Sequence, residues 1–454
     1  MYLIKLRYNL SQTSLRTIKA EQFMLALLLY RIILLLLLPL LLLALIIRSF
    51  NNTQYRQRLS ERLGFFPQSK NTNISAKNGI VIHAASVGEV IALTPLVEQL
   101  IQTYQHLPIT ITTFTPTGSA QVTKQFGQRV HHALLPLDIY PCTSLFLSRL
   151  QPKIMVFMET ELWPNLISQC AKSHIKLLLI NGRLSANSMK SYKKISALIK
   201  PALQRFDSIL CQSQDNLDNF LTLGAFPDKC QVSGNVKFDI SINDETRDKQ
   251  KTLQDLLVEK RPIWLVASTH QGDEEIALKA YAIIQAVFPQ LLLVLVPRHP
   301  ERFSAVAKMC IKRNYSIVKR SENALVDHQN IWLIDTLGEL MAAYSLANVV
   351  TIGGSFSHIG GHNPLEPALF KKPIIVGNDM KNFTDVFTQL HQNEGILQLS
   401  PTEENTPQAL AEKVLLLLEK TSYASVLGEN AHQVVLKNQG ASMRTFTQIQ
   451  ELLS

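Results

Sequence analysis

Chemically useful side chains stand where apolar runs of strand length end and helices begin. The first such junction is the stretch HAASVGEV at 83–90, in which Glu89 falls in the first turn of an expected helix. An acid at this place suits the helix dipole. A carboxylate in a partly dry site also acts as a general base, because burial raises its pKa toward neutrality and lets it take a proton from an attacking hydroxyl. The spacing alone fits both interpretations of Glu89.

A second junction, METELWPN at 158–165, carries Glu159 and Glu161 after a strongly apolar run. We expect one of these carboxylates to point inward, where an unpaired charge is costly and should meet a cation or a donor. The candidate is Lys237, in the stretch SGNVKFD at 233–239. Either Glu159 and Lys237 form a structural salt bridge, or Lys237 contacts a phosphate or carboxylate of a ligand.

The second half of the chain offers groups that bind anions. Arg298 follows an apolar run in PRHPER at 297–302, and its guanidinium is a fixed fork for phosphate or carboxylate. The segment DTLGEL at 335–340 comes next along the chain, before the stretch GGSFSHIGGHNPLEP at 353–367.

This glycine-rich stretch carries the densest signal in the sequence. Its four glycines let backbone approach a ligand, Asn363 is the expected helix cap, Pro364 the first helical residue, and Glu366 lies one turn in. A tight turn followed by a cap is the simpler alternative. The pattern is neither G-x-G-x-x-G nor a P-loop, so it indicates neither a dinucleotide nor an ATP γ-phosphate.

Several signals are absent from the sequence. No Asp-x-Asp follows a strand, no His or Cys cluster has metal-ligand spacing, and no Gly-x-Ser-x-Gly elbow occurs. We therefore predict no metal site and no cofactor, so that Lys, Arg and helix N-termini would stabilise a leaving phosphate. His131 and His132 are interpreted as a strand end, whereas the sequence leaves the roles of His270 and His299 open.

These junctions need sheets to position them. Apolar runs of strand length alternate with helix-length amphipathic stretches, which predicts parallel sheets with helical crossovers. The predicted strands are 79–85, 109–115, 130–136, 153–159, 176–180 and 208–211, then 262–268, 291–297, 315–318, 331–335, 349–352 and 373–376. We predict an α/β fold with two doubly wound domains that face a cleft, because ligands of such sheets bind beyond the carboxyl ends of the strands. The predicted boundaries are 1–66, 67–240, a linker at 241–260, 261–436 and a last helix at 437–454.

Composition and charge narrow the class of protein. The 454 residues are 46% hydrophobic and 18% charged, which excludes a disordered chain, and five scattered cysteines argue for a reducing compartment without structural zinc. Residues 1–70 hold ten basic and two acidic side chains and so carry most of the net charge of +10. This concentration of positive charge at one end of the chain favours an anionic membrane surface over nucleic acid as the partner, and we predict no nucleic-acid partner.

A membrane segment lies beside these basic residues. From Phe23 to Ile47 every residue is apolar except Tyr30 and Arg31. About 20 apolar residues cross a ~30 Å hydrocarbon core, so the segment can span if Arg31 snorkels or sits near an interface. A signal peptide would have a shorter apolar run and a cleavage site, and a buried soluble helix would need cover on all sides. Basic residues flank both ends, so the sequence leaves open whether the anchor spans or lies in one leaflet.

The motifs, taken together, resemble those of a known family. The stretches SVGE at 86–89, TPTG at 115–118, METELWPN, KFD at 237–239, VPRHPER at 296–302 and GGHNPLE at 360–366 occur in the same order in the 3-deoxy-D-manno-octulosonic acid (Kdo) transferases of Gram-negative bacteria. These are glycosyltransferases of the GT-B fold, with two Rossmann-like domains. The chain departs from the family pattern at Ala84 and Ala85, where relatives often carry polar residues, and in its longer N-terminus.

The resemblance implies an activity and residue roles. It implies transfer of Kdo from CMP-Kdo to the lipid A precursor at the cytoplasmic face of the inner membrane, with the acceptor in the first domain and CMP-Kdo in the second. Glu89 would be the base, and Glu159 and Lys237 would stabilise the transition state. The residues implied to bind CMP are Pro297, Arg298, Leu337, Gly338, Glu339, Asn363, Pro364, Leu365 and Glu366.

Two other functions fit the sequence less well. One is a membrane-tethered lipopolysaccharide-binding scaffold without turnover, and the other is a GT-B transferase that uses a UDP-sugar. The sequence does not report the number of Kdo units, the acylation of the acceptor, the oligomeric state or whether translation starts at Met1 or Met24.

Overall fold

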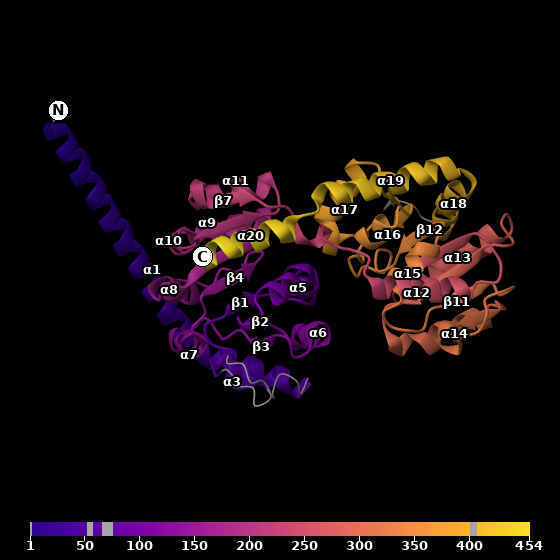
Figure 1. Ribbon diagram of the computed structural model, residues 1–454, viewed down its shortest axis with the longest axis horizontal. Helices are drawn as coiled ribbons and strands as arrows, with labels where there is room; N and C mark the ends of the chain where they lie inside the picture. The colour runs from indigo at the N-terminus through magenta and orange to yellow at the C-terminus, as the bar shows by residue number, and fades with distance from the viewer. Residues whose placement is uncertain (1, 52–57, 66–75, 400–405) are drawn as a thin grey trace. The chain divides into compact units, whose positions relative to one another are not determined.

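The computed structural model describes residues 2–51, 58–65, 76–399 and 406–454, and it divides the chain into two compact units. Unit 1 comprises Met1–Asp239 and Gln439–Ser454, and unit 2 comprises Ile240–Asn438 (Figure 1). The predicted start of the first domain, residue 67, lies outside the described residues. The last helix, α20 (Ala441–Leu453), belongs to unit 1, where it packs against α5 (Thr94–Thr103).

Unit 1 is built on a parallel sheet of seven strands in the order β3-β2-β1-β4-β5-β6-β7. The strands are β1 (Ile80–His83), β2 (Ile109–Thr113), β3 (His131–Leu134), β4 (Ile154–Met158), β5 (Lys176–Gly182), β6 (Ser208–Cys211) and β7 (Cys230–Val232). The six predicted strands are confirmed. Strand β7 was not predicted, because this edge strand has three residues, none of them buried, and lacks the apolar signal of the others.

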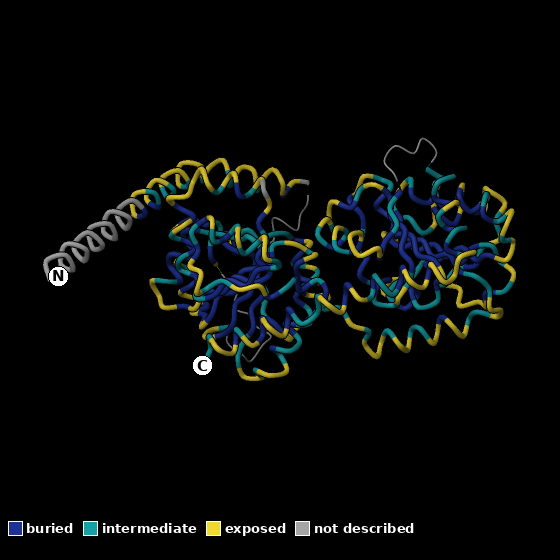
Figure 2. Tube along the Cα trace, turned by 90° about the horizontal axis from the view of Figure 1, so that it is seen from above, coloured by how far each residue is buried: buried dark blue, intermediate teal, exposed yellow. Residues whose placement is uncertain are grey.

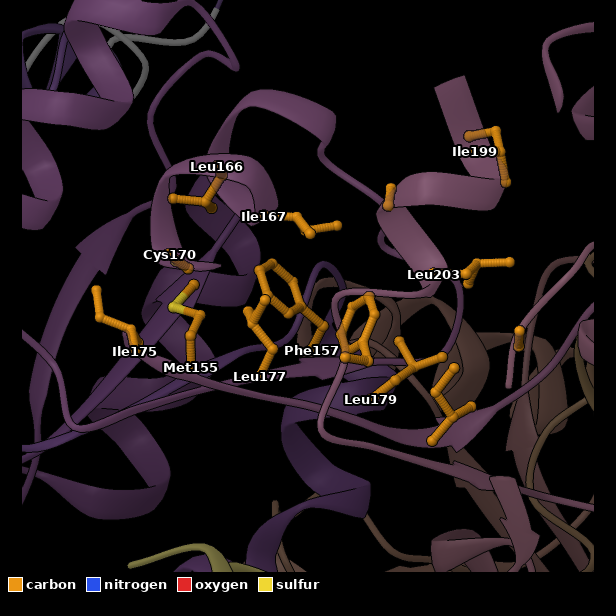
Figure 3. Close-up of a cluster of buried hydrophobic side chains, with 14 of the residues drawn as sticks. Met155, Phe157, Leu166, Ile167, Cys170, Ile175, Leu177, Leu179, Ile199 and Leu203 are labelled. Atoms are coloured by element: carbon orange, nitrogen blue, oxygen red, sulfur yellow. The ribbon is translucent and has the colours of Figure 1, made fainter. Parts of the chain in front are cut away.

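Side chains alternate across this sheet and form two apolar layers. In β4, Met155 and Phe157 join a cluster with α7 (Tyr140–Leu150), α8 (Pro164–Lys172) and α10 (Ser196–Leu203). Figure 3 shows the contribution of α8 and α10 to this cluster. Ile154, Val156 and Met158 face the opposite layer, which includes α4 (Val87–Ala92), α5 and α20. A strand buried on both faces is rigid, so its carboxyl end is a fixed platform for polar side chains. Unit 1 also contains α6 (Pro116–Phe126), α9 (Ala186–Lys194) and α11 (Gln214–Thr222).

Unit 2 repeats the plan with a parallel sheet in the order β10-β11-β9-β8-β12-β13-β14. Its strands are β8 (Ile263–Thr269), β9 (Leu292–Pro297), β10 (Ile317–Lys319), β11 (Ile331–Leu333), β12 (Val349–Ile352), β13 (Ile374–Val376) and β14 (Leu397–Gln398). Its α-helices are α12 (Asp244–Asp255), α13 (Asp273–Gln285), α14 (Phe303–Lys312), α15 (Leu340–Ala343), α16 (Leu365–Leu369), α17 (Thr384–Gln392), α18 (Thr406–Glu419) and α19 (Thr421–Asn438). The six predicted strands are confirmed, and only the two-residue β14 was missed.

The segment 241–260 is not a plain linker. Residues Asp244–Asp255 form α12, which is capped by Asn243 and contacts α15 within unit 2. The prediction was wrong because α12 buries only Leu253, so an almost wholly polar helix shows no apolar periodicity.

The N-terminal apolar segment is one long helix, α1 (Tyr2–Asn51), and its part Phe23–Phe50 is long and apolar enough to cross a membrane. Phe23 and Leu27 pack against Leu198 of α10. The short helix α3 (Leu59–Arg62) follows it in the described residues. This confirms the predicted apolar helix but does not by itself establish a span.

Candidate active site

The first candidate group lies at the carboxyl edge of the unit 1 sheet. Strands β1 and β4 are direct neighbours, with His83 paired to Phe157, so the junctions that follow them open side by side. The first junction carries Glu89 and the second carries Glu159 and Glu161. Parallel pairing therefore brings together carboxylates that are 70 residues apart in the sequence.

Glu89 lies in the first turn of α4, as predicted, and is nearly buried. Its carboxylate accepts hydrogen bonds from the backbone N–H of Ala85 and from Oγ of Ser86, both at 2.8 Å. Burial raises the pKa of the Glu89 carboxyl, and the charge of Glu159 also raises it, while the two hydrogen bonds act in the opposite direction. The geometry thus fits both a helix-terminal acid and an oriented base with a raised pKa.

Glu159 forms the predicted ion pair with Lys237, with Nζ 3.5 Å from Oε1. The loop that follows β6 and β7 positions the lysine, because Asn181 accepts a hydrogen bond from Val236 N and Asn235 accepts one from Lys237 N. Both side chains of the pair remain about one quarter exposed, at 24% and 23%. A partly exposed pair of this kind contributes little to stability, so Lys237 is available to a ligand.

Glu161 also has partners, so both carboxylates of this junction meet the cation or donor that was expected for an inward one. Its Oε2 accepts a hydrogen bond from Trp163 Nε1 at 2.9 Å and lies 3.6 Å from Nε2 of the buried His83. The Trp163 ring stacks on Phe114 with 5.7 Å between centroids. His83 and Trp163 were not predicted as site residues, although both lie in the two predicted junctions, and Glu161 was considered only as a possible inward carboxylate.

The second candidate group lies at the carboxyl edge of the unit 2 sheet, where β9, β8 and β12 are adjacent. Arg298 directly follows β9 and is exposed, with its backbone N–H bonded to Thr269 O. After β12, Gly353 packs so closely on β8 that a Cβ there would lie 2.6 Å from Ser268 O. Asp273 then accepts a hydrogen bond from Gly354 N at 2.7 Å and fixes the start of the loop.

Glu366 is half-buried in the first turn of α16, where the removal of its carboxyl from solvent raises its pKa to about 7. Asn363 donates a hydrogen bond from Nδ2 to Glu366 Oε1 at 3.3 Å, and its Oδ1 accepts one from Leu365 N at 3.0 Å, so it bonds to the first turn of α16 from the position before the N-cap, one residue from the predicted cap. Pro364 occupies the cap position rather than the first helical position, one residue from the prediction. The carboxyl of Glu366 is thus held at the ligand-facing edge of the sheet with capacity for a proton.

Three histidines, of which His362 was not singled out, gather at the same edge. His270 and His362 stack with centroids 5.0 Å apart and an Nε2–Nε2 distance of 2.8 Å, and His299 packs edge-on against His270. Burial lowers the pKa of His362 to about 4, so this ring is neutral at pH 7. The cluster therefore offers the neutral imidazole of His362 near Arg298.

The remaining predicted residues, Leu337, Gly338 and Glu339, follow β11, which is the neighbour of β9. Leu337 is exposed and Gly338 has a positive φ of 82°. The Glu339 carboxylate is bound by Arg320 at 3.0 Å and by Thr336. This loop therefore presents its backbone and Leu337 to a ligand more readily than the Glu339 charge.

A cluster with metal-ligand atoms lies elsewhere in unit 2. Within the described residues, one group of three has ligand atoms within 4.8 Å of one another, namely Glu259, Asp327 and His328. These residues precede β8 and β11, so they stand at the amino edge of the sheet, opposite the junctions. The cluster does not belong to the candidate site.

Comparison with known proteins shows to which family a chain with these two groups of candidate residues, one in unit 1 and one in unit 2, belongs. A family model described as 3-deoxy-D-manno-octulosonic-acid transferase (kdotransferase) matches residues 57–240. A 3-deoxy-D-manno-octulosonic acid transferase of Haemophilus influenzae is 43% identical over 397 residues, covering 87% of this chain and 91% of the relative. The chain belongs to the Kdo transferase family.

Further relatives agree with this assignment of the family. A Kdo transferase of Rickettsia felis is 34% identical, covering 80% of this chain and 77% of the relative. A glycosyltransferase structure from Rickettsia africae aligns with a TM-score of 0.51 and 16% identity, covering 83% of this chain and 99% of that one, and supports the fold alone. The predicted α/β fold with two Rossmann-like domains of the GT-B class and an N-terminal apolar helix is confirmed, and the chain is a glycosyltransferase.

Proposed function

We propose that this member of the Kdo transferase family transfers Kdo from CMP-Kdo to a lipid A precursor, lipid IVA, with inversion and without a metal. The observation that carries the proposal is the nearly buried Glu89 carboxylate, whose pKa is raised, next to the Glu159–Lys237 pair. A base of this kind suits the deprotonation of a sugar hydroxyl. The transfer adds one or more Kdo units.

In the proposed step, Glu89 takes the proton of the acceptor hydroxyl while the oxygen of that hydroxyl forms a bond to the anomeric carbon of Kdo. The bond from that carbon to the CMP phosphate oxygen breaks, and CMP leaves with the electron pair. Attack from the face opposite CMP inverts the anomeric centre. Lys237, oriented by Glu159, stabilises the charge that develops in the transition state.

CMP is proposed to bind at the unit 2 edge. Arg298 supplies a charged fork for the phosphate, next to Pro297. Leu337, Gly338 and Glu339, together with Asn363, Pro364, Leu365 and Glu366, complete the nucleotide site. Because the pKa of Glu366 is about 7, its carboxyl is able either to donate a hydrogen bond to a ligand hydroxyl or to accept one from it. The apolar helix α1 is consistent with action at the cytoplasmic face of the inner membrane.

Donor competition tests this assignment against a transferase that uses UDP-sugars. Purified full-length protein is assayed with CMP-Kdo and lipid IVA in the presence of EDTA, and CMP or UDP is added as a competitor. We expect CMP to inhibit and UDP to have little effect, because the product occupies the site of its own donor. Inhibition by UDP alone would favour the UDP-sugar transferase, and absence of CMP release would favour a scaffold protein.

A further inference from the structure

One face of α1 is less exposed than the other, and the start of its apolar segment packs on unit 1. The half-buried or buried positions of this segment are 23, 26, 27, 30, 31, 34, 38, 41, 42, 45 and 49, which recur at helical spacing. The opposite face exposes large apolar side chains, among them Leu25, Leu28, Leu36, Leu40, Ile47 and Phe50. Figures 1 and 2 both show the later part of α1 running alongside unit 1, and Figure 2 shows exposed residues on its outer side.

The two polar residues that interrupt the apolar segment attach its beginning to unit 1. Tyr30 donates its hydroxyl to Asp138 Oδ2 at 2.9 Å, and Arg31 donates Nε to Asn165 Oδ1 at 2.7 Å. Asp138 is buried and also accepts the backbone N–H groups of Asn165 and Leu166 at the start of α8. Arg31 is therefore bound to protein and does not snorkel toward an interface.

A second attachment follows the end of α1. Arg58 contacts His132 Nδ1 at 2.9 Å, and Glu61 accepts a hydrogen bond from Leu134 N at 2.7 Å. Arg62 is buried, donates to Leu135 O at 3.0 Å and lies over the Phe114 ring. Residues 58–62 are thus held at the carboxyl ends of β2 and β3, in the same unit as Asp138 and Asn165.

These two attachments are incompatible with a span. Residues 32–50 would measure about 28 Å as a helix, close to the ~30 Å of a hydrocarbon core, so a spanning α1 would place its two ends on opposite sides of the membrane. The intervening residues 51–57, NNTQYRQ, are polar and cannot recross it. We propose that α1 lies in the plane of one leaflet, with its outer apolar face in the hydrocarbon and its inner face on unit 1.

A basic segment beside α1 supports a lipid surface as the partner that covers the outer apolar face of α1. Residues 183–205, which include α9 and α10, contain six basic side chains and no acidic one. Helix α10 packs against α1, and Lys190, Lys193, Lys194 and Lys200 are exposed. An apolar helix face beside a basic surface is the pattern of a protein bound to one leaflet with anionic headgroups.

The attachments also place the membrane near the site. Asp138, Asn165 and residues 58–62 all follow or cap elements at the carboxyl edge of the sheet, where Glu89 lies. If the proposed function holds, a lipid acceptor reaches Glu89 from the leaflet that holds α1. The in-plane position of α1 itself does not depend on that function.

Depth measurements test the proposal. Single spin labels are attached at Leu25→Cys, Leu36→Cys and Ile47→Cys in the full chain carrying Cys230→Ser, since the other four cysteines are buried. The labelled proteins are bound to vesicles of phosphatidylethanolamine and phosphatidylglycerol. We expect equal immersion at all three sites, because all three are exposed on the outer face. A label at Leu38→Cys, on the inner face, is the matched control and should lie clearly shallower than its neighbour at 36.

A spanning helix gives a different profile, with position 36 deep, positions 25 and 47 both shallow, and positions 36 and 38 alike. That profile, or labels that all remain in water, would overturn the in-plane proposal. Kdo transfer is measured on the same labelled proteins, so that the position of α1 in the membrane and the proposed function are tested separately. A spanning profile with transfer intact rejects the in-plane helix alone, whereas an in-plane profile without transfer by the unlabelled protein rejects the proposed function alone.

Discussion

Replacing Glu89 by Gln should lower kcat by about 10²–10⁴-fold, the range typical of a lost general base, and leave KM for both substrates nearly unchanged. Gln keeps the shape of the side chain and an oxygen that accepts a hydrogen bond from Ala85 N or Ser86 Oγ, but it has no basicity. The measurement is the initial rate of CMP release with both substrates saturating. Glu98→Gln is the matched control, because Glu98 pairs with Arg129 on the surface and should not affect the rate.

The role of Glu89 as a base also predicts the direction in which the rate changes with pH. Because the pKa of Glu89 is raised, the wild-type rate should fall as the pH falls through that pKa, while the residual rate of the Glu89→Gln protein should stay flat over the same window. A carboxyl whose pKa is raised by folding destabilises the folded protein above its unfolded pKa. The Glu89→Gln protein should therefore unfold at the same or a higher temperature near pH 7. Wild-type turnover in the variant would rule out Glu89 as the base.

Replacing Lys237 by Met should lower kcat by about 10²–10³-fold, the cost of removing one donor that stabilises transition-state charge. Thermal unfolding should change little, because a partly exposed ion pair contributes about 0–1 kcal/mol. The control is Lys176→Met, which removes a comparable ion pair to Asp207 at 3.8 Å in the same unit. Calorimetry and single-turnover rates of both variants make the comparison.

The result distinguishes the two interpretations of the Glu159–Lys237 pair. If the pair is only structural, Lys237→Met and Lys176→Met should lose similar stability and retain similar rates. If Lys237 acts on the transition state, the two variants should differ in kcat and not in the unfolding temperature. Equal kcat values would therefore contradict the proposed role of Lys237.

The sequence was sufficient to place the candidate residues on the fold, for a physical reason. Strands buried on both faces are continuous apolar runs, and the polar residue that ends each run marks the edge where parallel sheets bind ligands. Glu89 after β1, Glu159 after β4 and Arg298 after β9 were found in this way. Element ends were predicted within a few residues because the runs themselves define them.

Contacts between distant segments could not be predicted in the same way. The hydrogen bond from Tyr30 to Asp138 joins residues 108 apart, and that from Arg31 to Asn165 joins residues 134 apart. No periodicity encodes such pairs, and the sequence alone treated Tyr30 and Arg31 as interruptions of an apolar segment. The stacking of His270 on His362, which are 92 residues apart, was missed for the same reason. Polar α12 and the edge strand β7 lack the burial that produces a readable pattern.

The most direct test of the proposed transfer is the mass of the acceptor after incubation with purified protein and CMP-Kdo. We predict that lipid IVA gains the mass of one or more Kdo residues in step with CMP release, and that the Glu89→Gln protein produces neither. Release of CMP by the wild-type protein without any gain in acceptor mass would contradict it.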